Sequence, residues 1–167
     1  MASAVFAGSF DPVTYGHLDL VERGLRLFEH ITIAVAQNDS KQPVFTAQER
    51  VALIERALDE RAIDRRRVEV VAFSGLIVSF AKARGASVLL RGVRTFTDYE
   101  YELSMARTNH DLAPEIETVF LAPSLATSYV ASRLIRECVR HGADVSHLIP
   151  AFVQTCLRER LNVPRSS

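Results

Sequence analysis

The sequence is poor in cysteine, has no surplus of either charge and lacks any long apolar run. Its 167 residues contain two cysteines, Cys138 and Cys156. Two are too few for a disulfide framework or a zinc cluster, so we expect small, buried, reduced thiols. Basic and acidic side chains both number 20, whereas proteins that bind duplex nucleic acid normally carry a basic surplus. No run is long enough to cross a bilayer and no signal-peptide pattern opens the chain, which predicts a cytoplasmic protein with neither nucleic acid nor membrane as partner.

The remaining composition is that of one folded domain. Hydrophobic residues make up 48% and charged residues 24% of the chain, which excludes wholesale disorder and allows a full core. No linker rich in proline, glycine or serine divides the sequence, so we expect one domain over residues 1–161 and a frayed tail at 162–167. Only two of the 20 basic residues are lysine, Lys41 and Lys82, and a lysine in a loop hints that a compact ammonium group is wanted there.

Short apolar runs alternate with helical patterns along the chain. We expect buried strands at residues 3–7, 31–36, 68–73, 88–90 and 118–121, and helices at 16–28, 46–60, 76–84, 99–112, 130–140 and 150–161. Thr46 and Glu49 fit a capping box, Gly85 fits a helix C-terminus, and the run Arg65, Arg66 and Arg67 is interpreted as a solvated turn. The predicted strands show no alternation of apolar and polar residues, and each is followed by a helix. This pattern predicts a doubly wound α/β domain with a five-stranded parallel sheet and a helical C-terminus.

Positive charge and hydroxyl groups follow the ends of these strands. His17, Lys41, Arg91 and Arg94 all lie in segments that come after a predicted strand. In an open parallel sheet these segments meet at one edge, where ligands bind. Individually the signals have ordinary explanations, such as a helix N-cap at Ser128. Together, in a protein of zero net charge, they predict an anion-binding site.

The residues after the first strand carry a family resemblance. The run 8–17, GSFDPVTYGH, resembles the (T/H)xGH signature of the nucleotidyltransferase superfamily. Further matches narrow the resemblance to the phosphopantetheine adenylyltransferase family: Ser40-Lys41, Phe45-Thr46 with Glu49-Arg50, Arg91-Gly-Val-Arg94, Asp98-Tyr-Glu-Tyr-Glu102 with Met105-Ala106 and Asn109, and Gly142 with Asp144-Val145. They extend from Ala4 to about Leu161, and the tyrosine–acid run is more specific than the histidine motif.

This resemblance implies a Rossmann-like nucleotidyltransferase fold and an enzyme of coenzyme A biosynthesis. Members of the family transfer AMP from ATP to 4′-phosphopantetheine, releasing pyrophosphate and forming dephospho-coenzyme A. The acceptor phosphate is itself the nucleophile, so the protein contributes positioning and charge neutralisation instead of a base. Mg²⁺ would be carried mainly by ATP, with no metal ligand from the protein. The family also implies a cytoplasmic homohexamer and suggests coenzyme A as a feedback inhibitor.

The resemblance also implies roles for individual residues. His17, Lys41 and Arg91 would be catalytic, with His17 on the α-phosphate and the two cations on the acceptor phosphate. The acceptor would be bound by Ser9, Lys41, Ile77 and Arg91. ATP would be bound by Ser9, Phe10, His17, Gly92, Val93, Arg94, Glu102, Thr127, Ser128, Tyr129, Val130, Ala131, Ser132 and Arg133.

One segment departs from the family pattern and leaves alternatives open. The family usually has a run of serines at the start of the penultimate helix, where this chain has Ala131, Ser132 and Arg133. Arg133 is long enough to reach the β- or γ-phosphate, or to point away to an acidic residue. A nucleotidyltransferase for another phosphorylated acceptor, such as nicotinate mononucleotide or glycerol phosphate, is one alternative. A non-catalytic sensor that binds ATP or coenzyme A is the other.

Overall fold

A computed structural model describes residues 2–37 and 42–164. Five parallel strands form one sheet in the order β3-β2-β1-β4-β5. The strands are β1 (Ser3–Gly8), β2 (His30–Ala36), β3 (Val68–Phe73), β4 (Val88–Gly92) and β5 (Glu117–Leu121). The helices are α1 (Tyr15–Gly24), α2 (Ala47–Glu60), α3 (Ile77–Ala83), α4 (Phe96–Leu112), α5 (Ser132–Arg140) and α6 (Ala151–Arg160). The doubly wound, Rossmann-like prediction is confirmed, and the strand order reverses between β1 and β4, where such folds bind ligands.

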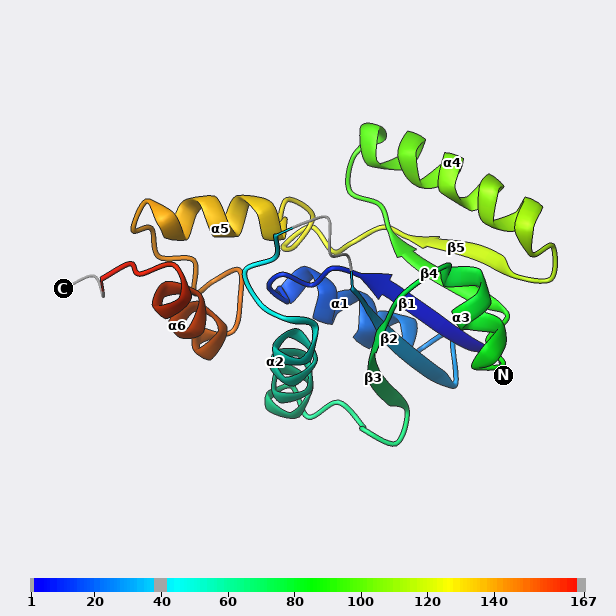
Figure 1. Cartoon of the computed structure of the whole chain (residues 1–167), viewed down its shortest axis with the longest axis horizontal. Coiled ribbons are helices and arrows are strands. Elements are labelled where there is room, and N and C mark those ends of the chain that lie inside the picture. Colours follow the sequence, from blue (N-terminus) through cyan, green and yellow to red (C-terminus); the bar gives the residue numbers. More distant parts are fainter. Residues whose placement is uncertain (1, 38–41, 165–167) are drawn as a thin grey trace.

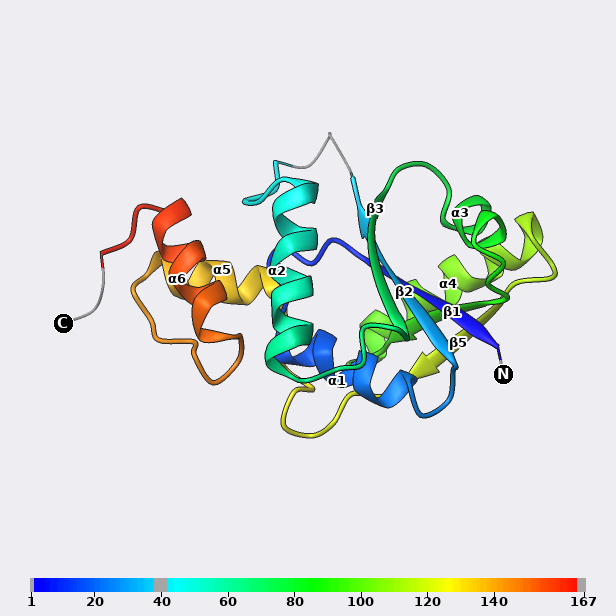
Figure 2. The same ribbon diagram turned by 90° about the horizontal axis from the view of Figure 1, so that it is seen from below.

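Helices cover both faces of the sheet (Figures 1 and 2). Successive residues of β1 alternate between two cores, with Phe6 in the core shared by α1, α2, α5 and α6, and Val5 in the core shared with α3. Both side chains are at most 4% exposed. Helix α4 lies over β5 at the other end of the molecule from α5 and α6 (Figure 1). Within the described ranges, no helix is long and apolar enough to span a membrane.

Local signals at two helix ends are confirmed. Thr46 caps α2, its hydroxyl accepting from the Glu49 amide at 3.2 Å while the Glu49 carboxylate accepts from the Thr46 amide at 2.7 Å. Gly85 follows α3 with φ +64°. Its amide bonds to the Lys82 carbonyl and the next amide bonds to the Ala81 carbonyl, the pattern that glycine favours after a helix.

Three local expectations are wrong. Helix α5 is not capped by Ser128, whose hydroxyl donates to the Leu125 carbonyl at 3.1 Å; the helix begins at Ser132. Arg67 is not simply solvated, because it donates to the Leu25, Phe28 and Glu29 carbonyls just after α1. Cys138 is exposed, because its position on α5 faces away from the core, and Cys156 is half-buried, because it packs against the edge of the core.

Candidate active site

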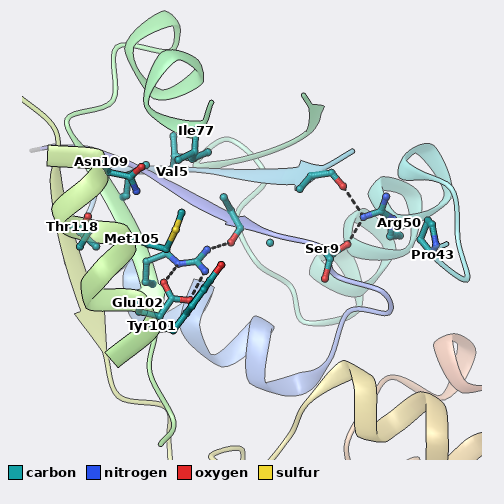
Figure 3. A pocket seen from close by; sticks show the side chains of 16 residues that line it. Val5, Ser9, Pro43, Arg50, Ile77, Tyr101, Glu102, Met105, Asn109 and Thr118 are labelled. Carbon is teal, nitrogen blue, oxygen red and sulfur yellow. Dashed lines mark hydrogen bonds and ion pairs between the residues drawn. The ribbon is translucent and has the colours of Figure 1, made fainter. Parts of the chain in front are cut away.

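Two cavities, each of about 370 Å³, open at the carboxyl edge of the sheet. The α1 cavity is lined by residues of β1, α1, the β4–α4 loop and the start of α5, including His17, Arg94 and Arg133. The α4 cavity is lined from the opposite face of the sheet, by residues that include Val5, Ile77 and Met105 (Figure 3). Five residues line both cavities: Ala7, Gly8, Ser9, Arg91 and Glu102. The two cavities therefore meet where the strand order reverses.

The loop after β1 forms part of the shared wall. Phe10 has φ +49°, a backbone conformation that is uncommon for a residue with a side chain. Its ring packs edge-on against Phe6 at 5.3 Å and His17 at 4.9 Å. The Asp11 carboxylate accepts hydrogen bonds from two backbone amides of the segment before α2, at 2.9 and 3.0 Å, and Arg136 donates to the Asp11 carbonyl. These contacts hold the loop in its strained form.

His17 is held in one tautomer by a helix cap. It is the third residue of α1, whose first turn is closed by a capping box with Thr14. The Thr14 amide donates to Nδ1 of His17 at 3.1 Å, so Nδ1 carries no proton and the neutral ring is protonated at Nε2. Burial, then the charges of Arg94 and Arg91, lower the pKa of His17 from 6.5 to about 4. At neutral pH the imidazole is an uncharged hydrogen-bond donor at a helix N-terminus.

Arg91 is paired with Glu102 between the cavities. Nε and Nη2 of Arg91 donate to the two carboxylate oxygens of Glu102 at 2.7 and 2.6 Å, and Nη1 donates to the Ala7 carbonyl (Figure 3). The Glu102 side chain is 13% exposed. Glu102, assigned to the ATP side from sequence, thus lines both cavities and contacts Arg91 directly. This forked pair fixes the plane of the guanidinium.

Arg94 connects the β4–α4 loop to the segment before α5. Its Nη1 donates to the Val130 carbonyl at 2.9 Å and its Nε to Asp98 at 3.1 Å. Ser132 donates its hydroxyl to the Pro12 carbonyl at 2.8 Å, so this hydroxyl holds the β1–α1 loop. Arg133 is exposed and lines the α1 cavity with these residues.

Most of the residues assigned from sequence come together at the two cavities. The α1 cavity gathers Ser9, Phe10, His17, Gly92, Arg94, Glu102, Thr127, Val130, Ala131, Ser132 and Arg133, and Ile77 lines the α4 cavity. Three residues do not line either cavity. Val93 continues the strand pairing by donating to the Leu121 carbonyl, Ser128 bonds to Leu125 and the Tyr129 side chain is 61% exposed. Lys41 lies outside the described residues.

Sequence reasoning gave no role to several residues that build the site. Asp11 and Arg136 hold the β1–α1 loop. Arg50 is 3% exposed and bonds to the Ser9 carbonyl. Met105 and Asn109, seen in the sequence only as family matches, line the α4 cavity. The spacing of these residues in the sequence does not predict that they meet near the end of the sheet, because the segments that they meet there lie far away along the chain.

Comparisons with known proteins agree with this fold. A family model described as cytidylyltransferase-like matches residues 5–138. A bifunctional NMN adenylyltransferase/ADP ribose pyrophosphatase from Francisella tularensis superposes with a TM-score of 0.72 at 15% identity, over 98% of this chain and 51% of that chain. Such a bifunctional protein from the same organism, complexed with AMP and Mn ion, gives 0.71 at 16% identity, over 97% and 51%. This chain spans about half the length of these two.

A third solved structure is matched over almost its full length. It is provisionally described as a nicotinate-nucleotide adenylyltransferase from Vibrio parahaemolyticus, and it gives a TM-score of 0.66 at 15% identity over 96% of this chain and 95% of that chain. At such identities, the likeness to solved structures shows a common fold.

Proposed function

Because the chain belongs to the cytidylyltransferase-like family, we propose that it transfers AMP from ATP to 4′-phosphopantetheine, giving dephospho-coenzyme A and pyrophosphate. The observation that carries the proposal is the meeting of a polar and a largely apolar cavity at Ser9 and Arg91. A transfer between two bound molecules needs two such compartments with one junction, where the reacting atoms are held in line.

The nucleotide would occupy the α1 cavity. Its phosphates would lie near the N-terminus of α1, where the helix dipole favours anions. Nε2–H of His17 and the cations Arg94 and Arg133 line the same cavity. ATP would enter as its magnesium complex, with phosphate oxygens as the principal ligands. The described residues contain no group of three or more His, Cys, Asp or Glu side chains that could hold a metal ion themselves.

The acceptor would occupy the α4 cavity. Ile77, Leu89 and Met105 give this cavity an apolar wall, and Asn109 adds an amide that can pair with an amide of the ligand (Figure 3). Arg91 lies at the junction with the nucleotide cavity. A slender chain with amide groups and one terminal phosphate fits this distribution of apolar and charged groups.

The reaction would need no protein base. An oxygen of the acceptor phosphate attacks the α-phosphorus of ATP, the bond from that phosphorus to the bridging oxygen breaks, and pyrophosphate leaves with the electron pair. Negative charge on the α-phosphate oxygens is stabilised by Nε2–H of His17, which the Thr14 amide already orients. Arg91, and by the family resemblance Lys41, would hold the acceptor phosphate in line.

A second acceptor class is favoured by the structural neighbours. Those proteins are described as acting on NMN or nicotinate nucleotide, and a pyridine mononucleotide also carries a phosphate that can attack ATP. Such a ligand carries ribose hydroxyl groups, for which the apolar side chains of the α4 cavity, such as Ile77 and Met105, offer no hydrogen-bond partner. The apolar lining of the α4 cavity therefore supports 4′-phosphopantetheine as the acceptor more strongly than a pyridine mononucleotide.

Pyrophosphate release from ATP and Mg²⁺ with each acceptor in turn tests the proposal. We expect turnover with 4′-phosphopantetheine and at most a trace with NMN, nicotinate mononucleotide or glycerol phosphate. Faster turnover with a pyridine mononucleotide would show that this mononucleotide, and not 4′-phosphopantetheine, is the acceptor. Tight ATP binding without turnover on any acceptor would support the non-catalytic sensor instead.

The proposal includes a homohexamer, as the family resemblance implies. Helix α4 has no buried residue in the described chain, and Phe96 and Tyr101 are 76% and 67% exposed. An apolar surface of this kind is typical of an interface. Sedimentation equilibrium of wild type and of Phe96→Glu measures the assembly, and addition of coenzyme A to the turnover assay measures feedback inhibition.

A further inference from the structure

The guanidinium of Arg50 is buried at the end of the sheet. It belongs to the first turns of α2 and is 3% exposed. Its Nε donates to the carbonyls of Phe45 and Thr46 at 3.1 and 3.3 Å. Its Nη1 donates to the carbonyls of Ser9 and Ala36 at 2.5 and 3.0 Å (Figure 3). These four oxygens come from the ends of β1 and β2 and the start of α2, so the plane of the guanidinium is fixed.

The donors of Arg50 are only partly used. A guanidinium has five N–H groups, of which one on Nε and two on Nη1 are directed to the four carbonyls. Over the residues that the structure describes, the two N–H groups of Nη2 have no hydrogen-bond acceptor. Nη2 is not enclosed by protein atoms, so these two N–H groups are accessible to a ligand in the cavity that Arg50 lines.

The charge of Arg50 is also without a close counter-ion. No carboxylate of residues 2–37 or 42–164 forms an ion pair with it. Asp11, whose charge acts on Arg50, accepts hydrogen bonds from two backbone amides and lies 3.7 Å from Arg136. Buried charges in proteins are normally paired, so this environment is suited to an anionic ligand.

Arg50 lies on the wall of the α4 cavity, next to the junction of the two cavities. It lines that cavity together with Ser9 and Pro43 (Figure 3), and Ser9, whose carbonyl it holds, lines both cavities. We propose that Arg50 is a further anion-binding residue of the α4 cavity, and that its Nη2 group donates to the phosphate of the acceptor. The identity of that phosphate rests on the proposed function, whereas the anion site itself does not.

Paired ligands distinguish contact with the phosphate from a purely structural role. Calorimetry would give the affinities of wild type and Arg50→Gln for 4′-phosphopantetheine and for pantetheine, which lacks the phosphate. We expect the preference for the phosphorylated ligand to fall about 10- to 100-fold in Arg50→Gln, the range for a hydrogen bond to a charged group. Pantetheine affinity should stay close to that of wild type.

Arg56→Gln is the matched control on the same helix. It removes the same charge from an exposed side chain that pairs with Glu60 and does not line the α4 cavity, so it should leave both affinities unchanged. Arg50→Lys keeps the charge but not the fork of donors, and should lose part of the phosphate preference. If Arg50→Gln does not fold, the Arg50→Lys comparison decides the question by the same ratio.

The outcomes separate this inference from the proposed function. If Arg50→Gln binds 4′-phosphopantetheine and pantetheine more weakly by the same factor, the role of Arg50 is purely structural and the proposal is overturned. An unchanged preference for the phosphorylated ligand would also overturn it. If wild type does not bind 4′-phosphopantetheine, inorganic phosphate becomes the probe. Phosphate binding that is lost in Arg50→Gln and kept in Arg56→Gln would uphold the anion site while the proposed acceptor fails; phosphate binding that is the same in both variants would overturn the site.

Discussion

The central groups of the two cavities are oriented by contacts that span very different distances along the chain. In the α1 cavity the central group, His17, is oriented by Thr14, three residues before it. In the α4 cavity Arg50 is held by Ser9, 41 residues away, and Arg91 by Ala7, 84 residues away. The first arrangement forms as soon as one helix turn forms. The second exists only when β1, β2, β4 and α2 are all in place, so substitutions at His17 should act differently from substitutions at Arg50 and Arg91.

The largest effect is expected at His17. His17→Ala should lower kcat by about 10²- to 10³-fold, because a preorganised donor to the developing charge is removed. The affinity for ATP should change little, since the same hydrogen bond is weaker in the ground state. Turnover and calorimetric ATP binding measure the two quantities. Near-normal turnover in His17→Ala would remove this residue from the chemistry.

Arg91 should affect the acceptor more than the nucleotide. Arg91→Ala removes a phosphate ligand and leaves the Glu102 carboxylate unpaired beside both cavities. We expect KM for the acceptor to rise and kcat to fall, together about 10- to 100-fold in kcat/KM. The control is Arg84→Ala, which removes an arginine that pairs with Glu69 and lines neither cavity. A loss confined to KM for ATP would assign Arg91 to the nucleotide instead.

Arg133 should have a smaller effect, confined to the α1 cavity. Its side chain is exposed at the start of α5, so solvent screens its charge. Arg133→Ala should weaken ATP binding by about 0.5–1 kcal/mol and leave acceptor binding unchanged. The double variant Ala131→Ser with Arg133→Ser, which restores hydroxyls at both positions, should recover that loss. Unchanged ATP affinity in Arg133→Ala would mean that this arginine does not contact phosphate.

The smallest change is expected in the pH profile of activity. The pKa of His17 in the free protein is lowered to about 4, so kcat/KM, which reports the free enzyme, should show no His17 titration near pH 6.5 and should fall through His17 only as the pH approaches 4. The unfolded chain binds the His17 proton near pH 6.5. The contribution of neutral His17 to stability is therefore complete above that pH and is lost as the pH falls through 6.5 towards 4. Chemical denaturation of wild type and His17→Gln at several pH values tests the effect on stability. A loss of kcat/KM near pH 6.5 that is present in wild type and absent in His17→Gln would contradict the lowered pKa.

The same difference in sequence distance explains which parts could be predicted. The strands, the Thr46–Glu49 cap and the Gly85 terminus depend on neighbouring residues, and these predictions are confirmed. The placement of His17 at a helix start is equally local. Nothing near Arg50 in the sequence shows that it lies under the end of β1, because its acceptors are carbonyl groups, which every residue has.

Local competition accounts for the error at Ser128. The apolar helical run that follows Ser128 favours a helix cap at this residue. In the fold, Thr127 bonds to the Ser124 carbonyl and Val130 to the Thr127 carbonyl, so the segment forms tight turns before α5 begins. Serine and threonine stabilise such turns as readily as they cap helices. The choice between the two depends on where the segment must meet Arg94 and Pro12.

The hydrogen bond from Thr14 to His17 joins the folding of α1 to the readiness of the site. When the first turn of α1 frays, the Thr14 amide leaves Nδ1, and the imidazole is free to rotate and to change tautomer. Helix ends open far more often than whole domains unfold. The exchange of the Thr14 amide proton with solvent deuterium therefore counts the molecules whose imidazole is momentarily unoriented. A backbone measurement on the free protein thus reports how large a fraction of it is ready to meet its substrates.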